Sequence, residues 1–415
     1  MSHPPRQFTL SPARCVLALS LASIGFAAQA ETTPLYYGGS LSLNHVSNLY
    51  RVSEGANSDD VATVSLLGGI DQHLGRQRLY ADASVQTNRY RKNGTLNNYG
   101  YNLKGGLDWS TIERLSGTLS VGSSRNLATY NIGSGITPVF EKNIETNDRL
   151  DAVVRLGLVT KFTLEGTAGM NRRRFSLIEY ARLEFDQNRY SLGLFYRPSA
   201  DLRLGVAGRR TNTDYLRYTI TSSPLVKPPT FATAKFERND IDLTTDWTLS
   251  GRSALFARLS SGRQTRTDGP NNNFSGVTGQ LTWRWQPTAR WNISTSVSRD
   301  TGLESTLFQT GASSTNYEQD RITKALQINA DYELTGKVFL TAGASLANSD
   351  RKTALAANTV PDYDKDKAFN LGARWLYSRG ITLGCQAGWN SRDSSTASYV
   401  YDATNFGCYG QLLIN

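Results

Sequence analysis

Side chains that commonly perform chemistry are scarce in this sequence. The 415 residues include only three His, three Cys and two Met. We find no HExxH, GxSxG or phosphate-binding loop, and no cysteine set with metal-ligand spacing. His45 beside Ser47 is the nearest approach to a base and nucleophile, and His73 lies elsewhere. We therefore expect no enzymatic activity, no cofactor and no metal site; a surface hydrolase that uses His45 is the remaining enzymatic alternative.

Long apolar runs are also missing. Mean hydropathy is −0.41 and only 19% of the residues are charged. After the N-terminus, no stretch approaches the roughly 18 consecutive apolar residues that a spanning helix requires. The sequence is instead rich in glycine and tyrosine, with 36 and 20 copies, which suits strands joined by tight turns.

The N-terminus has the three parts of a secretory signal. Arg6 and Arg14 are basic, residues 15–28 are apolar, and Ala28-Gln29-Ala30 is a cleavage motif. We expect residues 1–30 to be removed, leaving 31–415 as a single domain with net charge +10 − 2 = +8. Because export leads to an oxidising compartment, Cys385 and Cys408 are candidates for a disulfide, with two free lipid-facing thiols as the alternative.

Apolar and polar residues alternate along the rest of the chain. In residues 99–109, for example, Tyr101, Leu103 and Leu107 share one face, while Lys104 and Asp108 share the other. We place about eighteen such segments between Tyr36 and Ile414, each about ten to fourteen residues long. This periodicity predicts antiparallel sheet with one apolar and one polar face, as in a barrel or a soluble sandwich.

The connections between segments decide between these two folds. Short turns near residues 74–76, 110–113, 198–201, 287–289 and 335–337 alternate with long loops near 126–143, 212–233 and 300–317. All seven Trp lie on the apolar phase, and most adjoin the short turns, as expected for a membrane interface. The sequence therefore predicts a transmembrane outer-membrane β-barrel of about eighteen antiparallel strands.

The polar phase predicts which side chains line the interior. The candidates are Tyr80, Lys104, Arg155, Arg173, Arg189, Phe195, Arg203, Arg209, Asp242, Phe256, Arg258, Arg284, Phe339 and Arg374. The charged residues could attract a polar or anionic solute, or could simply pair across strands. The aromatic rings could stack on sugars, or could pack beneath an inward-folded loop.

The N-terminal third also carries an ordered set of short motifs. They are Ser47-Asn48-Leu49-Tyr50-Arg51, Asp59-Asp60, Leu74-Gly75-Arg76-Gln77, Tyr90, Tyr99-Gly100-Tyr101, Trp109 and Leu115-Ser116-Gly117. In this order and spacing, across residues 31–125, the chain resembles the EpsL-type outer-membrane β-barrel proteins of exopolysaccharide biosynthesis operons. The resemblance implies a passive conduit or guide for surface polysaccharide, acting beside periplasmic polysaccharide-export proteins.

Two other functions remain open at the level of sequence. One is a general or solute-selective porin, and the other is a non-conducting anchor that holds polysaccharide at the cell surface. The expected partners are outer-membrane lipid, lipopolysaccharide and exopolysaccharide, and no nucleic acid. Contact with anionic surface polymers would account for the basic net charge.

Overall fold

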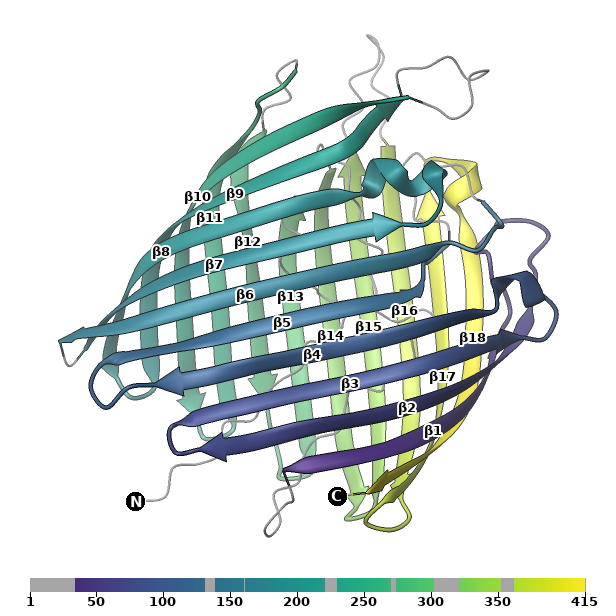
Figure 1. Cartoon of the computed structure of the whole chain (residues 1–415), viewed down its shortest axis with the longest axis horizontal. Coiled ribbons are helices and arrows are strands. Elements are labelled where there is room, and N and C mark those ends of the chain that lie inside the picture. The colour runs from purple at the N-terminus through teal and green to yellow at the C-terminus, as the bar shows by residue number, and fades with distance from the viewer. Residues whose placement is uncertain are drawn as a thin grey trace.

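The computed structural model describes residues 34–130, 139–159, 161–220, 230–269, 274–301, 321–351 and 362–414. These residues form one 18-stranded antiparallel sheet that closes into a barrel (Figure 1). The predicted fold class is thus confirmed. The predicted signal sequence, residues 1–30, lies outside the described residues.

The strands follow one another around the barrel in chain order. The first six are β1 (Leu35–Val46), β2 (Asp59–Leu74), β3 (Gln77–Tyr90), β4 (Asn98–Ser110), β5 (Leu115–Leu127) and β6 (Ile144–Val159). The next six are β7 (Phe162–Phe175), β8 (Phe185–Ser199), β9 (Leu202–Ile220), β10 (Phe231–Ser250), β11 (Ser253–Arg266) and β12 (Phe274–Trp285). The last six are β13 (Trp291–Thr301), β14 (Arg321–Thr335), β15 (Val338–Arg351), β16 (Asp362–Leu376), β17 (Ile381–Ser394) and β18 (Tyr401–Ile414).

The first strand closes the sheet by pairing with its neighbours on both sides. Leu41 lies opposite Val64 of β2 and opposite Gly410 of β18. Closure leaves no strand edge with unpaired backbone groups, which is the condition for crossing a bilayer with strands. No helix in the described ranges is long and apolar enough to span a membrane.

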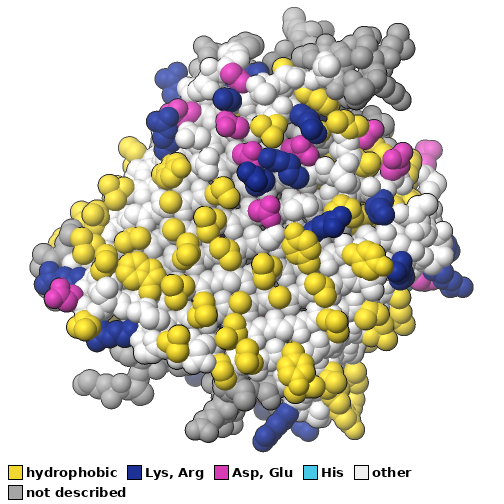
Figure 2. Space-filling view, in the orientation of Figure 1, with side chains coloured by type: hydrophobic (Ala, Val, Ile, Leu, Met, Phe, Trp, Pro, Cys, Tyr) yellow, Lys and Arg dark blue, Asp and Glu magenta, His cyan; other side chains and the backbone are white. Residues whose placement is uncertain are grey.

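Apolar side chains cover the outside of this sheet. Leu66, Leu192 and Ile241 are each more than 60% exposed, although leucine and isoleucine are normally buried in soluble proteins. Figure 2 shows hydrophobic side chains spread over the middle and lower part of the wall formed by β2–β9, with charged side chains gathered toward the long loops. This outward apolar surface places the barrel in the outer membrane.

The two ends of the barrel differ in the length of their connections. Short turns such as Gly75-Arg76 join strands at one end, where Gly75 has a φ of +63° that glycine readily adopts. Long connections lie at the other end, as the sequence predicted. The long loop expected at 212–233 is shorter than predicted, because β9 continues to Ile220 and β10 begins at Phe231.

All seven Trp lie on the outward face, as the alternation predicted. Trp109, Trp247, Trp283, Trp285, Trp291 and Trp375 are near the short-turn end, and Trp389 lies toward the other end. Trp283 and Trp285 stack with ring centroids 5.4 Å apart, and Trp291 lies 4.6 Å from Tyr332. An indole belt at one rim matches the preference of tryptophan for the interface.

At the long-loop end, two groups of loop residues pack on inward-facing side chains. In one, Leu49, Tyr50 and Leu96 pack with Val61 of β2 and Tyr90 of β3. Leu96 is fully buried and ends the short helix η1 (Gly94–Leu96). Because Val61 and Tyr90 point inward, these loops fold over the rim and narrow the mouth of the barrel.

The second group lies further round the mouth. Tyr180 and Leu183 of helix η2 (Ile178–Leu183) pack with Phe185, Tyr215 and Phe236, which belong to β8, β9 and β10. Burial raises the pKa of Tyr180 to about 12, so its phenol stays protonated in this apolar cluster. A third short helix, η3 (Ala397–Tyr399), joins β17 to β18 and has Tyr399 buried.

Candidate functional site: the barrel interior

The strand register places all fourteen predicted lining residues on the inward face. For example, outward Leu243 lies opposite outward Leu259, so that neighbouring Asp242 and Arg258 point inward. Nine of the fourteen gather on the contiguous strands β6–β11; they are Arg155, Arg173, Arg189, Phe195, Arg203, Arg209, Asp242, Phe256 and Arg258. The other five lie outside these strands. Arg284 is on the neighbouring β12, Tyr80 and Lys104 are on β3 and β4, and Phe339 and Arg374 are on β15 and β16.

Near the short turns, the inward charges form a chain of ion pairs. Glu165 accepts hydrogen bonds from Arg155 Nε at 2.8 Å and from Arg203 Nη2 at 2.9 Å. Arg203 also reaches Asp246 at 3.3 Å. One carboxylate therefore serves two guanidinium groups, and the side chains come from four strands, β6, β7, β9 and β10.

Halfway along the barrel, a second set of ion pairs is more deeply buried. Arg189 contacts Asp151 at 2.7 Å, and Arg209 contacts Asp242 through Nε at 2.8 Å. The side chains of Arg209 and Asp242 are only 4% and 7% exposed. Charges this buried require partners, and the alternation of arginine and carboxylate supplies them.

These pairs determine the electrostatics of the interior. Most inward arginines on β6–β10 have a carboxylate within hydrogen-bond distance, as with Arg173, whose Nε lies 2.9 Å from Glu145. Because the positive and negative side chains are paired, they produce local dipoles and no strong positive potential in the interior. Such a surface can hydrate a polar solute, and it favours anions only weakly.

The inward aromatic rings are held against the wall. Tyr80 lies directly opposite Gly106, and Phe195 lies opposite Gly205. A Cβ atom at either glycine would overlap the facing ring, so each ring covers a glycine of the next strand.

Guanidinium groups also lie over several of these rings. Arg203 lies 3.8 Å from the Phe195 ring centroid, Arg78 lies 5.2 Å from that of Tyr80, and Arg374 lies 4.9 Å from that of Phe339. Phe256 is 37% exposed and is therefore the candidate with the ring most open to a solute.

A basic cluster that the sequence did not predict forms where β16–β18 meet the loop between β1 and β2. Arg392 donates to Asp366 at 2.7 Å and lies over Tyr401, whose ring also faces Arg51. The alternation along β16, β17 and β18 turns Asp366, Arg392 and Tyr401 inward. Their positions could therefore have been predicted from the sequence pattern. Arg51 could not, because it lies in a loop and has a φ of +55°.

Arg51 is buried within this cluster. Burial lowers the pKa of the Arg51 guanidinium, while Tyr401 and Asp366 act in the opposite direction. Buried Arg238 was missed as well; it donates to Asp240 at 2.9 Å and to Thr301 at 2.7 Å.

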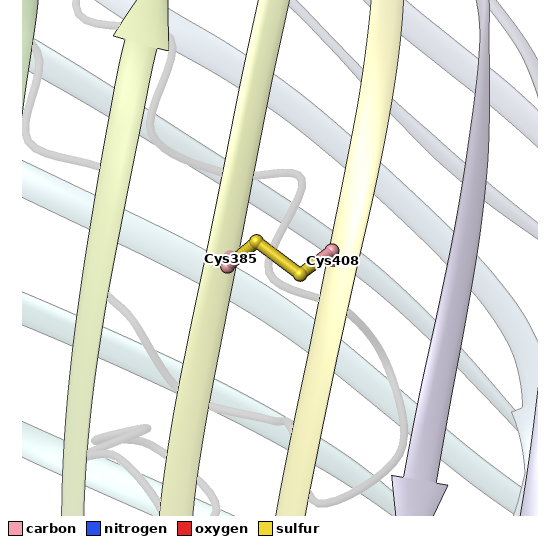
Figure 3. The surroundings of a disulfide bond; sticks show 2 residues. All are labelled: Cys385 and Cys408. Atoms are coloured by element: carbon pink, nitrogen blue, oxygen red, sulfur yellow. A yellow bond between two sulfur atoms is a disulfide. The ribbon is translucent and has the colours of Figure 1, made fainter.

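Cys385 and Cys408 form a disulfide between β17 and β18 (Figure 3). They are register partners, with Cα atoms 4.0 Å apart, and both point outward. The bond therefore lies on the membrane side of the terminal hairpin and does not line the interior.

The two histidines of the described chain lie at opposite ends of the barrel, and each is close to an aspartate. His45 Nδ1 lies 2.7 Å from Asp60 on the exposed outer face near the long-loop end. His73 lies at the short-turn end, with Nε2 4.0 Å from Asp71. Within the described part of the chain, no three His, Cys, Asp or Glu side chains are grouped to hold a metal ion.

Comparison with known proteins finds similarity in fold alone. No protein-family model matches the chain, and no curated protein matches it significantly. Among solved structures, Pseudomonas aeruginosa OpdK with vanillate is 11% identical with a TM-score of 0.49, covering 92% of this chain and 99% of OpdK. P. aeruginosa OccK2 (OpdF) in complex with glucuronate is 11% identical with a TM-score of 0.48, covering 92% and 98%.

A transporter barrel is similar to about the same degree. The FrpB iron transporter of Neisseria meningitidis is 10% identical with a TM-score of 0.45, covering 91% of this chain and 81% of FrpB. Likeness at this level does not identify a solute.

Proposed function

We propose that this protein is a passive, porin-like channel for small hydrophilic solutes in the outer membrane. The observation that carries the proposal is the inward face of the 18-stranded barrel, which presents ion pairs such as Arg203–Glu165 and Arg209–Asp242. Barrels of about 16 to 18 strands are wide enough to hold water inside. A water-filled interior with a polar lining lets a hydrophilic solute cross the membrane, whereas the apolar interior of the bilayer does not.

The narrowed mouth favours small solutes over a polymer. The loop that carries Leu49 and Tyr50 folds over inward Val61, and η2 folds over inward Phe185 and Tyr215. Both segments occupy space at the long-loop end through which a solute would pass. We infer that passage is limited by size, with only a weak preference for anions because most inward arginines are paired.

A liposome-swelling assay tests this function. Liposomes that contain the folded barrel should swell rapidly in a monosaccharide or a small sugar acid, and progressively more slowly in longer neutral oligosaccharides. Protein-free liposomes and liposomes with heat-unfolded protein are the controls. Swelling rates that match the controls for every solute would contradict a channel.

The second candidate is a role in exopolysaccharide export or anchoring, beside periplasmic export proteins. It is supported by the ordered motifs of residues 31–125, from Ser47-Asn48-Leu49-Tyr50-Arg51 to Leu115-Ser116-Gly117. Deletion of the gene should then reduce surface polysaccharide, and the wild-type gene should restore it. A deletion strain with unchanged surface polysaccharide would remove this candidate.

A further inference from the structure

A groove crosses the outer surface of strands β9–β16, on the membrane side of the wall. Its volume is about 1060 Å³. The register places its apolar lining outward; the residues that matter here are Leu259, Val277, Leu281, Val297, Leu326 and Leu346. An apolar hollow of this kind, facing hydrocarbon, can hold acyl chains.

Four cations line the same groove toward the long-loop end. Arg299 is the register partner of Lys324, and both Lys324 and Lys365 lie opposite Asn348. Lys367 lies one outward step below Lys365, opposite Leu346. All four side chains are exposed, so a row of positive charge lies directly above the apolar lining.

These cations differ from three outward arginines on β7 and β9, which are paired with carboxylates. Arg172 and Arg174 both pair with Asp186, and Arg210 pairs with Glu237. By contrast, none of the four groove cations has a carboxylate within 4.0 Å among the described residues. Arg299 donates to the carbonyl of Val277, and Lys365 lies 4.9 Å from the Tyr363 ring centroid.

Three acids lie near the row. One of them, Asp366, lies between Lys365 and Lys367 but points inward and pairs with Arg392. In register terms, Asp393 is opposite Lys365, and Asp350 is two residues from Asn348 on β15. Neither forms an ion pair with a groove cation. The row therefore keeps a net positive charge, and its cations can bind an external anion.

We propose that this surface binds the phosphorylated, acylated headgroup of lipid A in the outer leaflet. The long loops face the cell exterior, so the cation row lies at the level of outer-leaflet headgroups. Phosphates would contact the guanidinium of Arg299 and the ammonium groups of Lys324, Lys365 and Lys367, and acyl chains would fill the apolar groove below. Binding of lipid A at this outer surface does not require that the interior conducts.

The test measures binding of bisphosphorylated lipid A to the detergent-solubilised, folded barrel by native mass spectrometry. The variant R299Q/K324Q/K365Q/K367Q removes the row, while R89Q/R172Q/R174Q/R210Q removes four outward cations elsewhere. Each cation near an anionic lipid surface contributes roughly fivefold in affinity, so the row variant should bind at least about tenfold more weakly. The control variant should bind as the wild type does.

Three results would overturn the proposal. The first is an equal loss of lipid A affinity in both variants. The second is an unchanged lipid A affinity in the row variant. The third is that the wild type binds dephosphorylated lipid A as tightly as bisphosphorylated lipid A. Phosphatidylglycerol serves as a second probe; binding as tight as that of lipid A would assign the site to phospholipid instead. Retention of the fold in each variant is checked by the shift in gel mobility on heating.

Discussion

Tyr80 lies directly opposite Gly106 in the β3–β4 register, with its ring over the glycine. The same relationship holds for Phe195 and Gly205 of β8–β9, and for Tyr409 and Gly384 of β17–β18. These three inward rings are thus held against the wall by the absence of a side chain on the next strand. This arrangement keeps Tyr80, Phe195 and Tyr409 close to the wall, whereas Phe256 has no facing glycine and stays more exposed.

Replacement of Gly106 by valine should therefore destabilise the barrel. The new side chain would displace Tyr80, and overpacking of this kind costs about 1–3 kcal/mol. Urea unfolding followed by gel mobility measures the change in the free energy of unfolding. Gly105→Ala is the matched control, because a Cβ there meets only ordinary contacts, the nearest at 3.4 Å, and should have little effect. Equal stability of the two variants would contradict the role given to the pair.

Glu165 neutralises two arginines, so its removal should change ion selectivity. In Glu165→Gln, Arg155 and Arg203 lose their shared carboxylate, and permeability should shift toward anions. Arg203→Gln should shift it the opposite way. Reversal potentials across a KCl gradient measure both changes, with outward Arg172→Gln as the control. Shifts of the same sign in the two inward variants would exclude this assignment of charge.

The packing of Leu96 should control the mouth of the barrel. Its side chain is fully buried among Leu49, Tyr50, Val61 and Tyr90. Leu96→Ala should remove packing worth about 2–5 kcal/mol and loosen the inward-folded loops, giving faster limited proteolysis and larger current fluctuations. Ile112→Ala, at a turn where the side chain is 83% exposed, should leave both unchanged.

The disulfide should stabilise the strand that closes the barrel. Cys385 and Cys408 are 23 residues apart, and a loop of that length gives about 3 kcal/mol through the unfolded chain. Reduction of the wild type should lower the urea midpoint to that of the double variant C385S/C408S. Reductant should leave the double variant unchanged. A wild-type midpoint insensitive to reductant would show that pairing of β17 with β18 already supplies this stability.

The strands and their faces could be predicted because each follows from local alternation. Once the phase of a strand is known, every second residue is assigned to one face. The register turns Asp242 and Arg258 inward and the seven Trp outward, as this alternation predicts. A one-residue slip in register would turn the inward charges toward the lipid, so local pattern and global fold agree.

Partnerships across strands could not be read from the same pattern. The contact of Arg155 and Arg203 with one carboxylate depends on which residues of β6, β7 and β9 lie at the same height, and the stagger between strands sets that height. The positions of loop residues could not be predicted for a different reason. Arg51 and Tyr180 face the interior through packing of irregular segments, which has no periodicity.

The most direct test of the proposed channel is single-channel conductance of the refolded mature barrel in a planar bilayer. A polar interior narrowed at one mouth should give steady, ohmic current steps. Small hydrophilic solutes should reduce these steps more than large oligosaccharides that cannot enter. A folded barrel that inserts into the bilayer and passes no current would contradict the channel.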